Sequence, residues 1–392
     1  MHRFPASLFL ILSLGLAQCA LARPIRIAVD AEFSVPSSTS AQAIHNGAQV
    51  AVDEINAAGG VLGRKLELIK RDNRGVPARA ANNLRELAAD PDVVAVLCGK
   101  FSPVAVELLP EIHRLGMPYL DPWAAADPIT DNGYTPSYVF RLSLRDSAAM
   151  QVMLQHAAWR GAHKVGLLLP YSEWGRSNLR AAQSQAARAS RPEIVAFDWY
   201  HWGEQSLIPH YRKLAAAGVG AVILVANEQE GAVLINELAA LPRAQRLPIV
   251  AHWGITSGQF FRAAKKALPQ VDLAVVQTYT FIGKHDPVSA RLLSGLKTLT
   301  GNGDARRVDS PNGVAHAYDL VHFLARAIEK AGSSERPAVR DALENLGSYT
   351  GATRHYERPF TRQRHDALGV EDVFMARFAA DGAIEPLPGG GR

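Results

Sequence analysis

Short runs of apolar residues, many of them β-branched, alternate along most of this chain with longer segments of helical periodicity. Such runs are typical of β-strands that are buried on both faces. Strand, helix and strand repeated in this way predict parallel sheets with right-handed crossovers, which is an α/β fold of the doubly wound kind. A single sheet built from all the runs would be unusually large, so we expect two lobes. The runs lie at residues 25–29, 66–69, 93–97, 165–169, 194–197, 221–225, 249–251 and 273–276.

The last third of the chain has a different pattern. Residues 313–331 and 337–346 have the apolar spacing of two amphipathic helices. Residues 373–384 predict a β-hairpin that turns at Asp381 and Gly382. Residues 387–392 are rich in glycine and predict a flexible tail.

Residues 1–22 predict a cleaved secretory signal. A basic start precedes an apolar run at residues 8–17, and small residues at Ala20 and Ala22 match the two positions that a signal peptidase recognises. The apolar run is too short to span a bilayer, for which roughly 20 residues are needed. We therefore expect an exported protein whose mature chain begins at Arg23.

The two cysteines bear on processing and on disulfides. A lipid-modified Cys19 is the alternative to cleavage after Ala22, although Gln18 stands where a lipoprotein signal has a small residue. If Cys19 leaves with the signal, Cys98 is the remaining cysteine, and no disulfide can form within the mature chain.

Charge and motifs argue against nucleic-acid binding and against catalysis. Lys and Arg outnumber Asp and Glu by only 42 to 37 and are scattered along the chain, so we expect no nucleic-acid partner. The glycines of a dinucleotide loop are absent after the first apolar run, and the sequence has no Walker loop, nucleophile elbow or zinc motif. Asp72 and Asp146 are interpreted as helix-cap or loop carboxylates. We expect no enzyme activity, no catalytic residue, no metal and no cofactor.

Polar and aromatic residues follow several of the predicted strands, which is where open α/β sheets bind ligands. Ser102 is predicted to cap a helix whose first backbone N–H groups face an anion or a carbonyl, and an ordinary helix cap is the alternative. Asn227 and Glu228 directly follow another strand. Three tryptophans occupy similar positions and predict the walls of one cleft, namely Trp123, Trp174 and Trp253. The other three are interpreted as structural, namely Trp159, Trp199 and Trp202.

Residues 46–66, followed by Arg71, Asp72 and Asn73, resemble the N-terminal signature of a known family. The family is that of the type I periplasmic solute-binding proteins of ABC transporters, in its leucine/isoleucine/valine-binding class. Weaker similarity continues through residues 116–119, 138–141, 171–175 and 317–319, so that the resemblance covers most of the chain from residue 23 to about residue 386.

The resemblance implies two Rossmann-like lobes joined by three crossings, near residues 141–146, 277–281 and 346–351. The N-terminal lobe would comprise residues 23–142 and 281–347, and the C-terminal lobe residues 143–280 and 348–386. It also implies a periplasmic monomer whose cleft closes on a small-molecule solute and delivers it to an ABC permease in the inner membrane. A ligand-sensing module that regulates a partner protein is the alternative function.

The resemblance also implies a set of ligand-binding residues. Ser102 matches the hydroxyl residue that holds a ligand's charged end in this family, whereas Ala126 and Trp253 stand where a threonine and an acidic residue are common. These departures favour an aromatic or otherwise apolar solute with at most one strongly charged group, although Glu228 or Glu230 leaves an amino-acid-like solute open. The expected ligand-binding residues are Phe33, Phe101, Ser102, Trp123, Ala124, Ala125, Ala126, Trp174, Asn227, Glu228 and Trp253.

Overall fold

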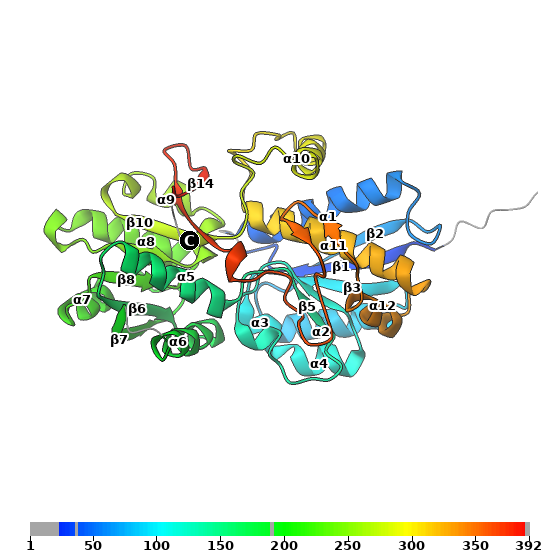
Figure 1. Cartoon of the computed structure of the whole chain (residues 1–392), viewed down its shortest axis with the longest axis horizontal. Helices are drawn as coiled ribbons and strands as arrows, with labels where there is room; N and C mark the ends of the chain where they lie inside the picture. The colour runs from blue at the N-terminus through cyan, green and yellow to red at the C-terminus, as the bar shows by residue number, and fades with distance from the viewer. Residues whose placement is uncertain (1–22, 36–37, 189–191, 389–392) are drawn as a thin grey trace, which may run out of the picture.

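Two sheets, one in each of two lobes, form the framework of the chain (Figure 1). The computed structural model describes residues 23–35, 38–188 and 192–388. The predicted signal at residues 1–22, with Cys19, and residues 389–392 of the predicted tail lie outside the described residues. The fold is α/β with mostly parallel sheets, as the alternation of apolar runs predicted, and each of the eight runs forms a strand.

The sheet of the first lobe has five parallel strands in the order β2-β1-β3-β4-β5. Strand β3 is buried at every position, which explains its continuous apolar sequence. Four helices pack on one face and three on the other. The strands are β1 (Ile25–Ala31), β2 (Leu66–Asp72), β3 (Val93–Cys98), β4 (Tyr119–Asp121) and β5 (Val139–Arg141). One face carries α1 (Ser40–Ala57), α10 (Pro287–Thr300), α11 (Pro311–Ala331) and α12 (Arg336–Leu343); the other carries α2 (Pro77–Ala89), α3 (Ser102–Glu107) and α4 (Leu109–Leu115).

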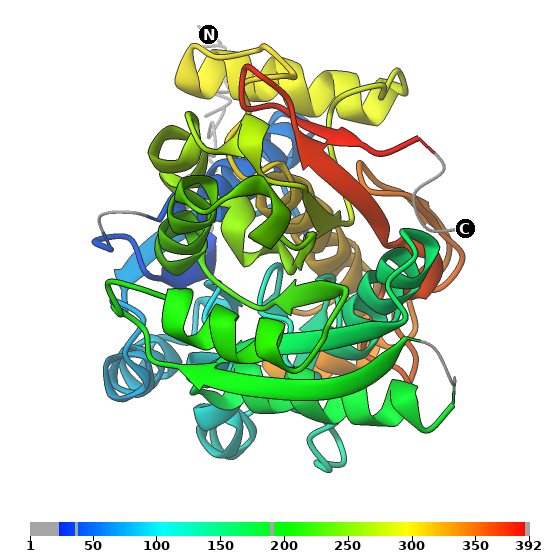
Figure 2. The same ribbon diagram turned by 90° about the vertical axis from the view of Figure 1, so that its left-hand side faces the viewer.

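The sheet of the second lobe has seven strands in the order β14-β13-β10-β9-β8-β6-β7, and the hairpin β13-β14 is its antiparallel part. Figure 2 views this lobe end-on, with the red hairpin at one edge of the sheet and the green strand β7 at the other. The strands are β6 (Lys164–Pro170), β7 (Glu193–Tyr200), β8 (Ala221–Leu224), β9 (Ile249–Ala251), β10 (Leu273–Gln277), β13 (Phe374–Phe378) and β14 (Ile384–Pro386). One face carries α5 (Asp146–Trp159) and α6 (Glu173–Ala186); the other carries α7 (Ile208–Ala216), α8 (Glu228–Ala240) and α9 (Phe260–Ala264).

The chain crosses between the two sheets three times. The chain passes from β5 to α5 and from β10 to α10. The short strands β11 (Tyr349–Thr350) and β12 (His355–Tyr356) still belong with the first lobe, because the rings of Tyr349 and Tyr356 pack against Phe323 of α11. The third crossing therefore lies between β12 and β13.

The end of the chain also differs from its expectation. The hairpin forms as predicted, with Phe378 paired to Ile384 and a positive φ of 93° at Gly382. Leu387 lies beyond it, but its backbone N–H donates to the carbonyl of Met375 at 2.8 Å. Residue 387, expected to begin the tail, is thus attached to the sheet.

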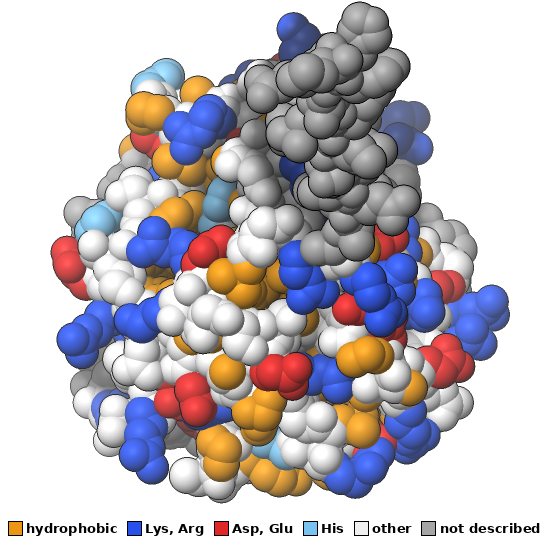
Figure 3. Space-filling view, turned by 90° about the vertical axis from the view of Figure 1, so that its right-hand side faces the viewer, with side chains coloured by type: hydrophobic (Ala, Val, Ile, Leu, Met, Phe, Trp, Pro, Cys, Tyr) orange, Lys and Arg blue, Asp and Glu red, His pale blue; other side chains and the backbone are white. Residues whose placement is uncertain are grey.

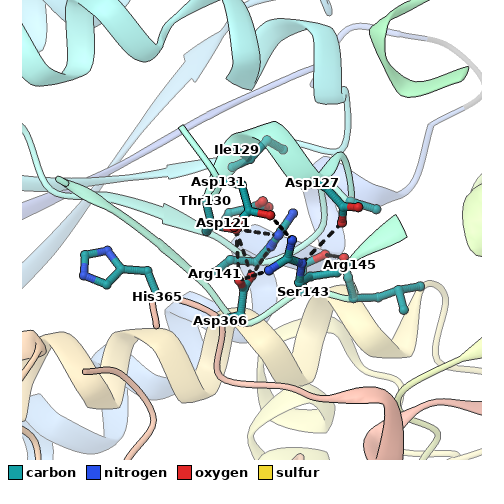
Figure 4. Close-up of polar contacts among 12 residues, drawn as sticks. Asp121, Asp127, Ile129, Thr130, Asp131, Arg141, Ser143, Arg145, His365 and Asp366 are labelled. Carbon is teal, nitrogen blue, oxygen red and sulfur yellow. Dashed lines mark hydrogen bonds and ion pairs between the residues drawn. The ribbon is translucent and has the colours of Figure 1, made fainter. Parts of the chain in front are cut away.

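A buried ion pair joins the first and third crossings (Figure 4). The Arg141 side chain is fully buried, and its Nε donates to Oδ1 of Asp366 at 2.6 Å. The backbone adds to this contact, since Arg141 donates to the carbonyl of His365 at 2.8 Å and accepts from Ala367 at 2.9 Å. Thr130 and Arg145 also contact the Asp366 carboxylate. The two crossing segments are therefore fixed side by side.

The surface charge is mixed. Figure 3 shows the end of the first lobe, where Lys and Arg side chains lie among acidic and apolar ones. The mixture of side chains on this face agrees with the scattered distribution of basic residues in the sequence. Among the described residues, no helix is both long enough and apolar enough to cross a membrane.

Replacing Arg141 should strongly destabilise the protein. Arg141→Met removes the main partner of a carboxylate that is itself almost fully buried, and such losses cost about 3 kcal/mol or more. The matched control is Arg160→Met, because the pair between Arg160 and Asp272 is exposed and should contribute less than about 1 kcal/mol. Urea denaturation followed by circular dichroism measures both changes, and equal losses in the two variants would contradict the assigned role.

Candidate functional site

A small cavity of about 10 Å³ lies between the two lobes, at the carboxyl ends of strands from both sheets. This is the place where parallel α/β sheets bind ligands. The first lobe contributes residues after β3 and β4, and the second lobe contributes residues after β6, β7, β8 and β9. The lining residues are Lys100, Phe101, Ser102, Pro103, Trp123, Ala125, Trp174, Trp202, Asn227, Trp253 and Gly254.

Seven of the eleven expected ligand-binding residues line this cavity, and four do not. Phe33 packs its ring against His45 of α1, 6.3 Å away. Ala124 and Ala126 are buried beside the cavity, where their backbone N–H groups donate to Asp121 and to Ser102 respectively. Glu228 is buried in an ion pair described below. The seven on the wall are Phe101, Ser102, Trp123, Ala125, Trp174, Asn227 and Trp253.

Three buried indoles dominate the wall. The ring of Trp123 in the first lobe lies 5.5 Å from that of Trp253 in the second. Small neighbours make room for such large side chains: a Cβ at Gly313 would lie 2.8 Å from the Trp123 ring, and one at Gly254 would lie 2.8 Å from the Trp174 ring. The cavity therefore offers flat apolar surfaces on both lobes.

Trp202 is a fourth indole on the wall, although the sequence pattern indicated a structural role for it. Its side chain is 41% exposed, and its ring lies 5.5 Å from that of Phe101 in the opposite lobe. The missed signal is the length of β7, which continues to Tyr200 rather than ending with its apolar run at residue 197. Trp202 thus follows a strand end by two residues, as Trp123 and Trp253 do.

Ser102 differs from its expectation in one respect. It lines the cavity, but it is the first residue of α3 and makes no cap hydrogen bond to that helix. Instead its hydroxyl oxygen accepts the backbone N–H groups of Ala125 and Ala126 at 3.1 and 3.2 Å. The prediction of an N-cap is therefore wrong, because the loop after β4 supplies better-placed donors.

Lys100 and Glu228 form an ion pair across the cleft. The Lys100 ammonium lies 2.8 and 2.7 Å from the two oxygens of the Glu228 carboxylate. The two side chains are only 1% and 4% exposed. Glu228 is one of the expected ligand-binding residues, whereas Lys100 is not.

A buried carboxylate orients the wall of the second lobe. The indole N–H of Trp174 donates to Asp146 Oδ1 at 3.1 Å, and Nε2 of His252 lies 3.1 Å from the same oxygen. Asp146 thus has a structural role, and the Trp174 side chain that it holds is part of the cavity wall. Asp72 keeps the simpler role that the sequence suggested, accepting the backbone N–H groups of Ser34 and Arg74.

Asp121 holds the loop that carries Trp123. Its Oδ1 accepts the backbone N–H groups of Trp123 and Ala124 at 2.9 and 2.7 Å. Burial raises the pKa of Asp121 to about 7, while Arg141 and these N–H groups act in the opposite direction. Within the described residues, no group of three His, Cys, Asp or Glu side chains has the arrangement of a metal site.

The model of the family described as periplasmic binding protein matches residues 24–383. The chain belongs to this family. It is 25% identical, over 338 residues, to the Leu/Ile/Val-binding protein BraC3 of Rhizobium johnstonii, with 86% of this chain and 87% of that protein covered. The resemblance to the leucine/isoleucine/valine-binding class is thus confirmed.

Solved structures of periplasmic binding proteins share the fold. The periplasmic binding protein type 1 of Bordetella pertussis Tohama I has a TM-score of 0.82 at 21% identity, with 93% of this chain and 100% of that chain covered. A solute-binding protein from R. palustris in complex with 4-hydroxybenzoate has a TM-score of 0.76 at 17% identity, with 93% of this chain and 95% of that chain covered.

His316 supports the wall of this periplasmic binding protein from α11. Its Nδ1 donates to the carbonyl of Pro122 at 2.9 Å, Nε2 lies 3.0 Å from the hydroxyl of Thr278, and its ring lies 5.9 Å from that of Trp253. Burial lowers the pKa of His316 to about 4, against a smaller opposite effect of the Pro122 carbonyl. The imidazole is therefore neutral in the folded protein at neutral pH.

Stability should fall as the pH is lowered below about 6.5. In this range the unfolded chain takes up a proton at His316 that the folded chain excludes. The free energy of unfolding therefore falls by about 2 kcal/mol between about pH 7 and pH 5. His316→Gln should remove that part of the pH dependence, while His45, whose pKa burial also lowers to about 4, remains in both proteins. Urea denaturation at several pH values measures the slope, and an unchanged slope in the variant would overturn this assignment.

Proposed function

We propose that this protein is the periplasmic solute-binding component of an ABC importer and that it delivers its solute to an inner-membrane permease. The solute is a small molecule with an aromatic or otherwise apolar body and at most one strongly charged group. It binds in the cavity between the lobes, against the expected ligand-binding residues on the wall together with Lys100 and Trp202. The observation that carries this proposal is the set of four indoles from both lobes on one wall.

The polar groups of the cavity support a solute of this kind. Trp253 places an indole where many members of the class have an acidic residue, and Ala126 has no hydroxyl. The fixed carboxylate and hydroxyl that would hold a free α-amino acid are thus replaced by apolar groups. Ser102 and Asn227 remain as neutral hydrogen-bonding side chains on the wall.

The relatives support two solute classes. The name of the Rhizobium relative indicates branched-chain amino acids for that protein, whereas the Rhodopseudomonas structure holds an aromatic acid in the same fold. The indoles of the present cavity favour the second class, because aromatic rings pack well against one another.

We propose a lobe division that follows the observed contacts. The first lobe comprises residues 23–142 and 281–367, and the second comprises residues 143–280 and 368–386. The three crossings between them act as the hinge when the lobes close on a solute. A monomer suffices for this activity, because both walls of the cavity come from one chain.

Aromatic probes should bind more tightly than aliphatic amino acids. Calorimetry with benzoic acid and its uncharged analogues, beside leucine and valine, compares the two classes. Trp253→Ala should weaken binding of the aromatic probe about thirtyfold, since truncating a buried aromatic anchor costs about 2 kcal/mol. Trp159→Ala is the matched control, because Trp159 is 66% exposed on α5 and does not line the cavity. Tight binding of leucine that Trp253→Ala leaves unchanged would refute the proposal.

The exported protein should begin at Arg23. Residues Ala20 and Ala22 present small side chains to a signal peptidase, and replacing Ala22 with Asp should block processing. N-terminal sequencing and the intact mass of the periplasmic protein measure the cleavage site. A lipid-modified N-terminus at Cys19 would show that the chain is anchored instead.

A further inference from the structure

The ion pair between Lys100 and Glu228 lies beside the proposed solute. Lys100 follows β3 in the first lobe and is on the cavity wall, and Glu228 begins α8 in the second lobe. Because both side chains are almost fully buried, the attraction between them is weakly screened by solvent. The pair therefore puts one positive and one negative charge beside the cavity.

The Lys100 ammonium has chain acceptors for all three of its N–H groups. Two of these N–H groups donate to the Glu228 carboxylate oxygens, and the third donates to the hydroxyl oxygen of Ser257, which lies 3.3 Å from Nζ. The Ser257 hydroxyl in turn donates to Glu228 Oε2 at 3.0 Å. The positive charge on this wall is therefore balanced inside the protein.

The backbone donors beside Lys100 are also engaged. The N–H of Lys100 donates to the carboxylate of Glu32 at 3.2 Å, and those of Ala125 and Ala126 donate to Ser102. The Glu32 side chain is 1% exposed, so a second buried carboxylate lies near this wall. Ser102 keeps its hydroxyl hydrogen, which suits a carbonyl or hydroxyl oxygen.

A charged solute would disturb this balance. A solute carboxylate that binds the Lys100 ammonium must compete with Glu228 and Ser257 for it, and displacing Glu228 would leave a buried carboxylate without its counter-ion. A solute cation that binds Glu228 must compete with Lys100 for the carboxylate, and displacing Lys100 would leave the buried ammonium without its counter-ion. An uncharged polar group leaves the pair intact and still hydrogen-bonds to Ser102 or Asn227.

We propose that the pair of Lys100 and Glu228 determines the charge preference of the cleft and selects a solute that is uncharged at the end facing the pair. This inference rests on the proposed function and makes its solute class narrower. Removing one partner exposes the charge of the other to the solute. Lys100 alone would favour a carboxylate, and Glu228 alone would favour a cation.

Benzoate, benzamide and benzamidine test this assignment, because they have nearly the same shape and carry a negative, zero and positive charge. Calorimetry compares the wild type with Glu228→Gln, Lys100→Met and the double variant. The wild type should bind benzamide at least tenfold more tightly than the other two. Glu228→Gln should shift the preference at least tenfold toward benzoate, and Lys100→Met should shift it toward benzamidine. The double variant should return to the preference for benzamide.

The outcomes separate this inference from the proposed function. Binding of the probes in the same order by all four proteins overturns the charge assignment and leaves the aromatic solute in place. Failure of all four proteins to bind any probe overturns the proposed function, and the inference with it. Circular dichroism checks that each variant folds. If a single variant does not fold, the wild-type order decides alone, since tighter binding of benzoate than of benzamide by the wild type contradicts the inference.

Discussion

The indole rings of Trp123 and Trp253 meet across the cleft, within one hydrophobic core that includes residues of both lobes. Much of the surrounding sequence follows from the size of these two rings. Gly313 leaves space for Trp123, Asp121 holds the loop that carries it, and His316 lies beside Trp253. Large flat side chains can line a narrow cavity only where their neighbours are small or hydrogen-bonded in place. The same constraint that shapes the core therefore shapes the proposed solute site.

Two buried ion pairs have different relationships to the movement of the lobes. Arg141 and Asp366 both lie where the crossing segments leave the first lobe, and their backbones are paired as well. This ion pair can therefore stay intact when the lobes separate. Lys100 and Glu228 belong to opposite lobes, so opening the cleft must break their contact. Under the proposed hinge motion, the second pair links closure to the charge inside the cleft, because the two charges are desolvated together only when the lobes are closed.

The strands could be predicted because burial on both faces leaves continuous apolar runs, as in β3 and β8. The packing of β11 and β12 on the first lobe could not, since these strands have two residues each and depend on contacts with Phe323. Position after a strand identified three wall tryptophans, but Trp202 was missed because polar residues extend β7 beyond its apolar run. Lys100 and Glu228 are 128 positions apart, so no local pattern could indicate their pairing.

Native mass spectrometry of the protein purified without denaturation from the periplasm of its own cells tests the central claim most directly. The mass difference between the native and denatured protein identifies a retained solute without any choice of probe. The present account predicts a small aromatic compound that is uncharged at one polar end. A retained leucine, isoleucine or valine would contradict it, because the cleft would then hold two charged groups for which its own charges are already paired.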